Sequence, residues 1–312
     1  MVTQVQVSVV VPTRDRHELL AEALASIRAI EGPDLVFEIL VCDNGTDRAQ
    51  AAVVAARFGA QHLDVAEAGA GAARNAGLLA ATSEYVAFLD DDDLWLPEHI
   101  RPHLALLAAR PELAAVVGQT VTTDDHRTPA GEPWPAALPA SGNVFQEFLN
   151  EYPQIGSTVI RTRVRESVGL FDAALLGDQD WEWHLRLARQ HGVGFVAVPS
   201  VLFRQRPAGS FDGLQWKRLG FMRRVLFRTL VRAGGQRPTL THSAQLVLRH
   251  HGEYYRYFRE SAARHIEAGE HREAWTALFR ALASSPPHAA RDMTGSPGIW
   301  AMMATLLLEV RH

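Results

Sequence analysis

The feature that most constrains the fold is an alternation, over the first 121 residues, of short apolar runs with helix-like patterns. Val5–Val11 and Val36–Cys42 are runs rich in β-branched and large apolar side chains, as buried strands are. Between them, apolar residues recur at helical spacing from Leu19 to Ile27. Strands that alternate with helices pair in parallel, because the chain crosses back over the sheet between them. The sequence therefore predicts an α/β fold with a doubly wound, mostly parallel sheet flanked by helices.

The same reasoning extends along the chain and divides it into three regions. Residues 122–142 lose periodicity and are rich in Pro and Ala, so we expect a long surface loop of the kind that frames binding sites. From Asp212 the pattern is helical to the end, with breaks at Gly234–Gly235 and Pro286–Pro287. The regions are thus 1–121, 122–211 and a C-terminal helical extension, 212–312. Further helices are expected over Thr46–Phe58, Ala70–Ala81, Glu98–Ala109 and Trp181–Gln190, and further strands over Tyr85–Leu89, Leu113–Val121, Ile155–Ile160 and Gly194–Val198.

Charge and cysteine content exclude several classes of protein. A net charge of −4 argues against a nucleic-acid binder, which depends on a positive surface. Cys42 is the only cysteine, so no internal disulfide forms, and its apolar surroundings predict a small buried side chain. No signal peptide is readable, and no apolar run reaches the roughly 20 residues of a membrane span. Ile299–Val310 comes nearest, and we expect it to be a buried helix. We therefore expect a cytoplasmic protein, with peripheral membrane contact and homo-oligomers left open.

The strongest chemical signal is the segment Phe88–Pro97, in which four aspartates, Asp90 to Asp93, follow an apolar strand. Adjacent carboxylates at a buried strand end repel one another, and a divalent cation relieves that repulsion. Carboxylate oxygens suit Mg²⁺ or Mn²⁺, and the spacing of an EF-hand loop is absent. The alternative interpretation is a solvated acidic turn, or a cap for a helix that begins at Pro97.

Polar residues also follow the other apolar runs, at the strand ends where open α/β sheets bind ligands. Together these segments resemble glycosyltransferase family 2, inverting enzymes of the GT-A fold, here in a bacterial form. Each segment is short, but they occur in the family's order over about two-thirds of the chain. The matching segments are Val10–Arg16, Val41–Asp47, Gly69–Gly77 with Arg74 and Asn75, Phe88–Pro97, Gly169–Asp172 and Asp178–Trp181.

The resemblance implies a nucleotide-diphosphate-sugar donor and a divalent metal, Mn²⁺ or Mg²⁺. Asp43 would accept a hydrogen bond from the nucleobase, Asp90 would lie near the ribose and sugar, and Asp92 would contact the metal on the diphosphate. Arg74 would approach the donor sugar or steady the aspartates. Arg206 stands where the family often has a histidine near the diphosphate. The residues assigned to nucleotide and donor binding are Pro12, Thr13, Arg14, Arg16, Asp43, Arg74, Asp90, Asp91 and Arg206.

The resemblance also makes Asp180 the general base that takes the acceptor's proton. The preceding position is often Glu in the family and is Gln179 here. Asp178 supplies a second carboxylate nearby, on the acceptor side of the site or as an N-cap of the following helix. Trp181 stacks on an acceptor ring in one interpretation and packs in the core in the other.

Two other functions stay open at this point. One is a nucleotide-sugar-binding protein without transfer activity, and the other is a sugar-phosphate nucleotidyltransferase. The second would need a Gly-rich basic loop after the first strand, which Thr13–Arg16 does not provide. A dinucleotide fingerprint at Gly69 and Gly71 fails because Arg74 replaces its third glycine. The leading hypothesis is an inverting, metal-dependent glycosyltransferase acting on a saccharide, lipid-linked or natural-product acceptor.

Overall fold

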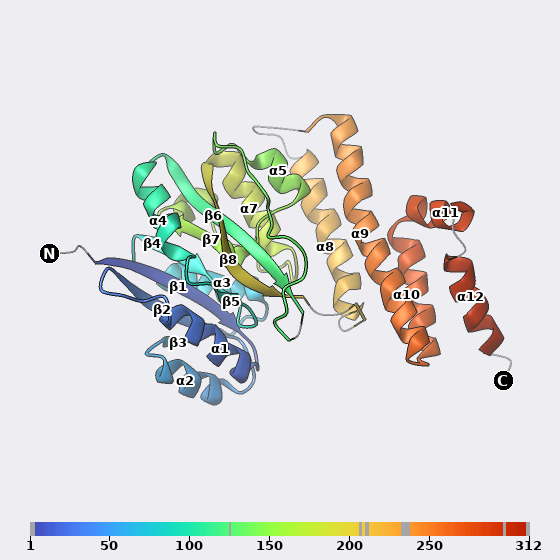
Figure 1. Ribbon diagram of the computed structural model, residues 1–312, viewed down its shortest axis with the longest axis horizontal. Coiled ribbons are helices and arrows are strands. Elements are labelled where there is room, and N and C mark those ends of the chain that lie inside the picture. The colour runs from blue at the N-terminus through green and yellow to red at the C-terminus, as the bar shows by residue number, and fades with distance from the viewer. Residues whose placement is uncertain are drawn as a thin grey trace. The chain divides into compact units, whose positions relative to one another are not determined.

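The computed structural model describes residues 4–124, 126–205, 208–209, 212–231, 238–295 and 298–309. The chain divides into two compact units, residues 1–205 and 206–312. The first is a mixed α/β unit and the second is helical (Figure 1). Over the part of the chain that is described, no helix combines the length and the apolar character needed to cross a bilayer.

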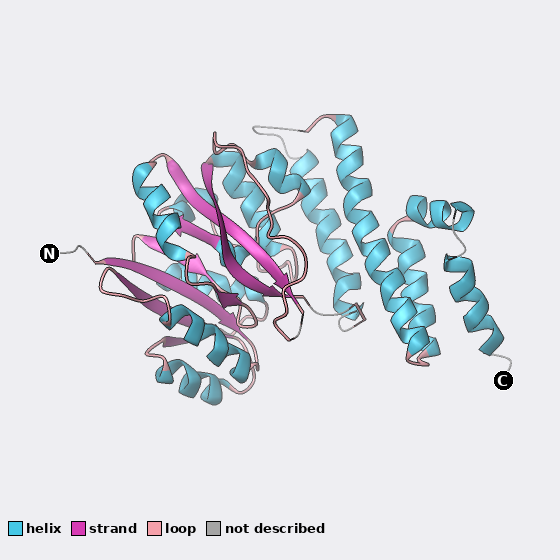
Figure 2. Ribbon diagram, viewed as in Figure 1, coloured by secondary structure: helices cyan, strands magenta, loops and turns pink. Residues whose placement is uncertain are grey.

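An eight-stranded sheet organises the first unit within the described residues, in the order β3-β2-β1-β4-β7-β6-β8-β5 (Figure 2). Strands β1 to β4 pair in parallel, as do β6 and β8, whereas β7 is antiparallel to both of its neighbours and β5 is antiparallel to β8. The expected doubly wound, mostly parallel α/β sheet is confirmed. The strands are β1 (Val5–Thr13), β2 (Leu35–Asp43), β3 (Gln61–Asp64), β4 (Tyr85–Phe88), β5 (Leu94–Trp95), β6 (Leu113–Thr123), β7 (Thr158–Arg161) and β8 (Gly192–Arg204).

Helices cover both faces of this sheet. They are α1 (His17–Arg28), α2 (Arg48–Arg57), α3 (Ala70–Ala80), α4 (Ile100–Ala109), α5 (Phe145–Asn150), α6 (Val164–Val168) and α7 (Gln179–Gln190).

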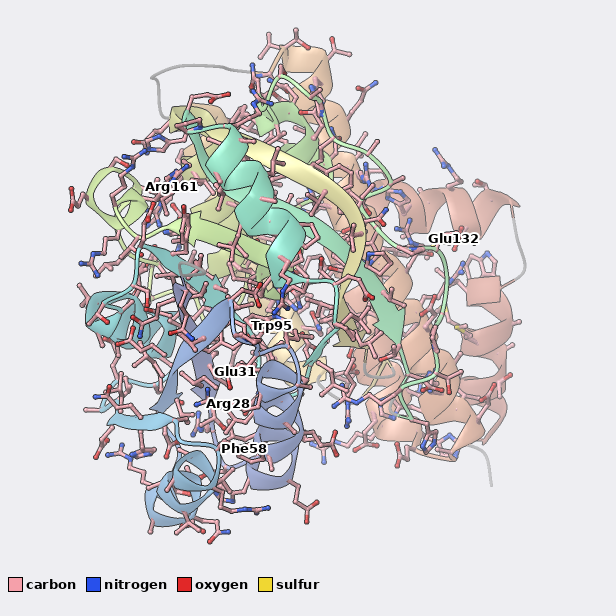
Figure 3. The ribbon with its side chains drawn as sticks, turned by 60° about the vertical axis from the view of Figure 1, so that its left-hand side comes forward. Arg28, Glu31, Phe58, Trp95, Glu132 and Arg161 are labelled. Atoms are coloured by element: carbon pink, nitrogen blue, oxygen red, sulfur yellow. The ribbon has the colours of Figure 1, made fainter. Side chains whose placement is uncertain are left out.

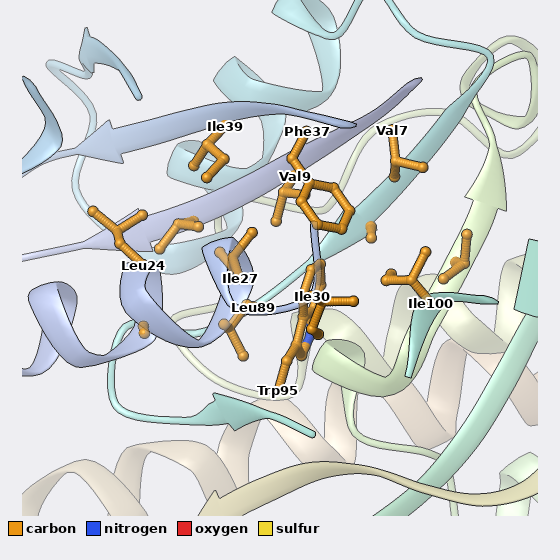
Figure 4. Close-up of a cluster of buried hydrophobic side chains, with 14 of the residues drawn as sticks. Val7, Val9, Leu24, Ile27, Ile30, Phe37, Ile39, Leu89, Trp95 and Ile100 are labelled. Carbon is orange, nitrogen blue, oxygen red and sulfur yellow. The ribbon is translucent and has the colours of Figure 1, made fainter. Parts of the chain in front are cut away.

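The alternation of side chains along β1 decides which helix packs where. Val7 and Val9 face a core that α1, α2 and α4 complete (Figure 4). Val10 points to the opposite face, where α3 approaches so closely that a Cβ on Gly77 would overlap the Val10 side chain. Because successive residues of a strand point to opposite faces, one apolar run supplies both cores. β1 is buried from Val7 to Thr13 because it lies inside a sheet covered on both sides.

A single arginine ties the ends of α1 and α2 together. Arg28 donates from Nε to the carbonyl oxygen of Phe58 (2.8 Å) and pairs through Nη1 with Glu31 (2.5 Å) (Figure 3). These contacts satisfy backbone groups that the helix end of α2 leaves without an intrahelical partner. They anchor the two helices on their common face of the sheet.

The second unit consists of helices in its described residues and has its own apolar core. The expected helical extension is confirmed. The expected break at Pro286–Pro287 is present, because one helix ends at Ser284 and the next begins at Pro286. The other expected break, Gly234–Gly235, lies outside the described residues. Ile299 and Leu306 of the last helix are buried, but Trp300 is 53% exposed, so Ile299–Val310 is only partly the buried helix that we expected. The helices are α8 (Asp212–Val231), α9 (Leu240–Glu267), α10 (His271–Ser284), α11 (Pro286–Gly295) and α12 (Gly298–Glu309).

Several expected boundaries were wrong. Ile155–Ser157 form a 3₁₀ turn and the strand begins only at Thr158. Helix α4 begins at Ile100, so it does not begin at Pro97. A short strand that was not expected, β5, occupies Leu94–Trp95 before it. Strand β3 and helices α5 and α6 were not expected, since all three are shorter than seven residues and give little periodic signal.

Candidate active site

The carboxyl ends of β1, β2 and β4 meet at one edge of the sheet, as parallel pairing requires. Thr13 lies directly opposite Asp43 in the register of β1 and β2, and Val10 lies opposite Phe88 of β4. The chain leaving β4 therefore carries Asp90 to the same edge. Sequence positions almost 80 residues apart are brought together here, and this edge is our candidate active site.

The four aspartates separate into a buried pair and an accessible pair. Asp91 and Asp93 are 0% and 1% exposed, whereas the side chains of Asp90 and Asp92 are 21% and 20% exposed. Asp91 accepts a hydrogen bond from Thr13 Oγ1 (2.7 Å), and Asp93 accepts one from the backbone N–H of Arg204 (2.9 Å). The buried pair thus holds the turn in place, whereas the accessible pair is the part of the cluster that a ligand can reach.

Two arginines pair with three of the four aspartates. Arg16 reaches Asp91 through Nη2 (2.5 Å) and Asp92 through Nη1 (2.6 Å). Arg74 pairs with Asp90 through Nη2 (2.5 Å). Arg14, on the same turn as Arg16, is exposed, and Pro12 before it is buried. The predicted residues Thr13, Arg16 and Arg74 therefore do lie together with the acidic segment.

Arg74 has unused hydrogen-bonding capacity although it is 2% exposed. Among the described residues its Nε and Nη1 have no hydrogen-bond acceptor. Its guanidinium lies 5.8 Å from the centre of the Phe171 ring. Buried N–H groups are normally satisfied, and two unsatisfied ones beside a carboxylate suit a polar or anionic ligand.

The electrostatics of the aspartates follow from burial and mutual repulsion. Burial is the main cause that raises the pKa of Asp91 to about 7, and the Arg16 guanidinium opposes the rise. Burial also raises the pKa of Asp90 and carries that of Asp93 well above its ordinary value, with repulsion from Asp92 adding to both. A bound cation would favour the ionised carboxylates.

The residues present fit a metal ion whose coordination is completed by the phosphates of a bound nucleotide. In the described ranges no group of three or more His, Cys, Asp or Glu side chains is arranged to hold a metal ion. Mg²⁺ on a nucleotide needs only one or two protein carboxylates, because phosphates and water supply the other ligands, and carboxylates also suit Mn²⁺. Asp90 and Asp92 offer two accessible carboxylates of this type at the sheet edge.

Asp43 is almost completely buried at the end of β2. Its Oδ1 accepts a hydrogen bond from Gly45 N (2.7 Å), and its Oδ2 lies 3.2 Å from His62 Nε2. His62 comes from β3, whose polar sequence gave no strand signal, so its place beside Asp43 was not predicted. The side chain of His62 is 19% exposed and borders the carboxylate that the resemblance assigns to the nucleobase.

Asp180 arrives at the site from the second half of the first unit. It lies in the first turn of α7, and its Oδ1 accepts from the N–H of Trp181 (2.9 Å). The residue before Asp180, Gln179, lies against Gly71 of α3, the helix that carries Arg74. The Asp180 charge raises the pKa of both Arg74 and Asp90, which are about a hundred residues away in the sequence.

Asp178 and Trp181 flank this carboxylate in different ways. Asp178 occupies the N-cap position with φ of 59°, but its side chain makes no capping hydrogen bond, so that interpretation was wrong. Trp181 is 2% exposed, stacks on Tyr152 and donates from Nε1 to the carbonyl of Phe148 (2.7 Å). We therefore assign Trp181 to core packing. Arg206 lies outside the described residues.

Asn75 shows how two of the motifs depend on each other. Its side-chain amide accepts from Phe171 N (2.8 Å) and donates to Phe171 O (3.0 Å). Phe171 in turn stacks on Trp183 of α7, with ring centres 5.0 Å apart. The contact joins α3, which carries Arg74, to the segment that leads into α7 and Asp180.

Arg127 was not predicted to belong to the site, because it lies in the aperiodic segment 122–142. Its Nη1 donates to the carbonyl oxygen of Asp92 (2.8 Å), and its Nη2 pairs with Glu22 (2.9 Å). A loop that framed the site was expected, and this contact ties the loop to the acidic turn. Only the folded structure shows which basic residue of the loop contacts the acidic turn.

The family model described as glycosyl transferase family 2 matches residues 8–165, and it ends before Gly169–Asp172 and Asp178–Trp181. The uncharacterized glycosyltransferase YwdF of Bacillus subtilis is 26% identical over 215 residues, which cover 65% of this chain and 76% of that protein.

Two solved structures share the fold. The mannosyltransferase PcManGT from Pyrobaculum calidifontis, in complex with GDP-Man and Mn²⁺, superposes with a TM-score of 0.58 at 21% identity, covering 97% of this chain and 85% of that one. S. aureus TarS 1-349 superposes with a TM-score of 0.56 at 17% identity, covering 90% and 81%. The family model spans half of the chain, including every segment from the first strand to β7. The chain therefore belongs to glycosyl transferase family 2 and has the GT-A fold.

Proposed function

We propose that this protein transfers a sugar, with inversion, from a nucleotide-diphosphate donor to an acceptor hydroxyl. The observation that carries the proposal is the convergence of Asp43, Arg74, the Asp90–Asp92 pair and Asp180 at one edge of the sheet. Residues 1–121 would bind the donor, and residues 122–211 would face the acceptor. TarS has been solved with UDP-GlcNAc and PcManGT with GDP-Man, which supports a nucleotide-sugar donor here.

The donor would lie along the edge from β2 to the acidic turn. Asp43 would accept an N–H of the base, and His62 beside it would contact the same ring. Asp92, with Asp90, would hold Mn²⁺ or Mg²⁺, which supplies positive charge to the leaving diphosphate. The unused N–H groups of Arg74 would bind the sugar or phosphate oxygens.

Transfer then requires one proton to move and two bonds to change. The acceptor oxygen forms a bond to the anomeric carbon while the bond from that carbon to the diphosphate oxygen breaks. Asp180 takes the proton of the acceptor hydroxyl, and the nucleoside diphosphate leaves with the bonding pair. Attack from the side opposite the diphosphate inverts the anomeric configuration.

A binding experiment tests the metal. Calorimetry of UDP, GDP, ADP and CDP, each with and without Mn²⁺, should identify one diphosphate that binds mainly with metal. The variant Asp92→Asn should weaken that binding about 10- to 100-fold, while Asp34→Asn, an exposed aspartate at the opposite end of β2, should not. Metal-independent binding that Asp92→Asn leaves unchanged would contradict the assignment.

A kinetic experiment tests the base. Asp180→Asn keeps the side-chain shape and should lower kcat about 10²- to 10⁴-fold, with nucleotide affinity near that of the wild type. Glu182→Gln, on the next position but one of α7, is the control and should have a much smaller effect. Normal turnover by Asp180→Asn, or a product that NMR shows to retain the anomeric configuration, rules out this mechanism.

A further inference from the structure

The two units carry opposite charges that the net charge conceals. Residues 1–205 contain 15 Arg and Lys and 27 Asp and Glu, whereas residues 206–312 contain 16 and 8, so the formal charges are −12 and +8. The positive charge is concentrated in the 40 residues from Gly213 to Gly252, which include no Asp or Glu. The basic residues of this segment are Lys217, Arg218, Arg223, Arg224, Arg228, Arg232, Arg237 and Arg249.

One face of α8 exposes basic and large apolar side chains together. Lys217 and Arg224 are exposed, and they lie between Leu214 (41% exposed) on one side and Phe227 (65%) and Val231 (56%) on the other. These five positions are separated by three, seven, three and four residues, spacings that place them on one side of the helix. The other side of α8 is buried: Leu219, Met222, Val225, Leu226 and Thr229 are all at most 7% exposed.

The start of α9 continues this surface. Helices α8 and α9 lie side by side (Figure 1), and Arg223 Nε donates to His251 Nε2 across them (3.0 Å). Leu240 is 91% exposed, Val247 is 36% exposed and Leu248 is 45% exposed. We call α8 together with residues 240–249 of α9 the basic hairpin.

The mixture of charge and apolar area distinguishes between ligands. A hydrated polyanion would use the arginines but would leave Phe227, Val231 and Leu240 in water. A symmetric dimer of this chain through these surfaces would bring two like-charged hairpins together. An anionic lipid surface satisfies both groups, since phosphates pair with arginine while the apolar side chains enter the acyl boundary.

We propose that the basic hairpin docks the protein on a membrane surface rich in anionic phospholipid. The docking is peripheral, through exposed faces of α8 and α9. It does not depend on the transfer reaction proposed above, because none of its residues belongs to the site at the sheet edge.

Vesicle flotation of the full chain tests the proposal. The protein should float with vesicles of equal parts phosphatidylglycerol and phosphatidylcholine, should not float with phosphatidylcholine alone, and should be released as ionic strength rises. Phe227→Ser should lower the partition coefficient about tenfold or more. The double variant Lys217→Gln, Arg224→Gln should lower it about 25-fold, from a roughly fivefold effect for each charge near an anionic surface.

Matched controls come from α9 and α10 outside the basic hairpin. Phe279→Ser alters a side chain that is equally exposed (68%), and Arg264→Gln with Arg272→Gln removes the same charge. Both controls should partition much as the wild type does. Absence of flotation, or equal loss in the controls, overturns the proposal. So does tight binding of inorganic polyphosphate that Phe227→Ser leaves unchanged, or a dimer in vesicle-free sedimentation that Phe227→Ser dissociates.

Discussion

Removal of the Asn75 side chain tests how the two halves of the first unit are joined. Asn75 makes a two-bond contact with the backbone of Phe171, at 2.8 and 3.0 Å, in a partly buried position. Each such bond contributes about 0.5–1.5 kcal/mol, so Asn75→Ala should lower the free energy of unfolding of this unit by about 1–3 kcal/mol. Asn75→Asp keeps the bond to Phe171 N but sets a carboxylate oxygen against Phe171 O.

Urea denaturation followed by tryptophan fluorescence measures this loss, because Trp183 stacks on Phe171. Asn150→Ala is the control, since the Asn150 side chain makes one bond, to Gln146 O (2.9 Å), and should cost about half as much. Asn75→Asp should be no more stable than Asn75→Ala. The reasoning fails if Asn75→Ala costs no more than Asn150→Ala, or if Asn75→Asp unfolds at the wild-type urea concentration.

Three further predictions concern packing, acid stability and the loop. Gly77→Ala should destabilise the first unit by about 1–3 kcal/mol in urea denaturation, because the added Cβ would overlap Val10. Burial lowers the pKa of His103 from 6.5 to about 4. Between pH 6.5 and pH 4 the imidazole is therefore protonated in the unfolded chain but neutral in the folded one. Stability is therefore lost on acidification by up to about 3 kcal/mol, and denaturation at pH 7 and pH 5 should show a shallower loss in His103→Asn. Arg127→Gln should weaken metal-dependent nucleotide binding about tenfold by freeing the carbonyl of Asp92, and calorimetry showing wild-type affinity would contradict the role of the loop.

Much of the fold was readable because it depends on local pattern. The buried runs of β1 and β2 and the spacing of apolar residues in α1 are properties of consecutive residues, and the structure has these elements within two residues of the expected bounds. Because the carboxyl ends of parallel strands lie at the same edge of a sheet, the sequence also predicted that Thr13 and Asp43 lie close together. The burial of Cys42 followed from the same apolar run, and burial raises the pKa of its thiol to about 12.

What the sequence could not supply depends on contacts between distant segments. β7 enters the sheet between β4 and β6 and is antiparallel to both, and no local pattern in the sequence identifies these partners. Asp90 and Asp92 are the accessible aspartates because the other two are buried, where Thr13 donates a hydrogen bond to Asp91 and the Arg204 backbone donates one to Asp93. Trp181 is in the core because Phe148 and Tyr152 cover it, although its neighbours in sequence are charged.

The sequence by itself determined the order of the segments that carry chemistry, because each motif is a run of adjacent residues. It also determined the opposite charges of the two units, which the net charge of the whole chain does not reveal. The tertiary structure alone decided which side chains face solvent and which face one another: Arg127 over the acidic turn, His62 beside Asp43 and Phe227 in water. The physical reason is that pattern along the chain specifies elements, whereas burial and pairing are set by segments that meet only when the sheet and the helices pack.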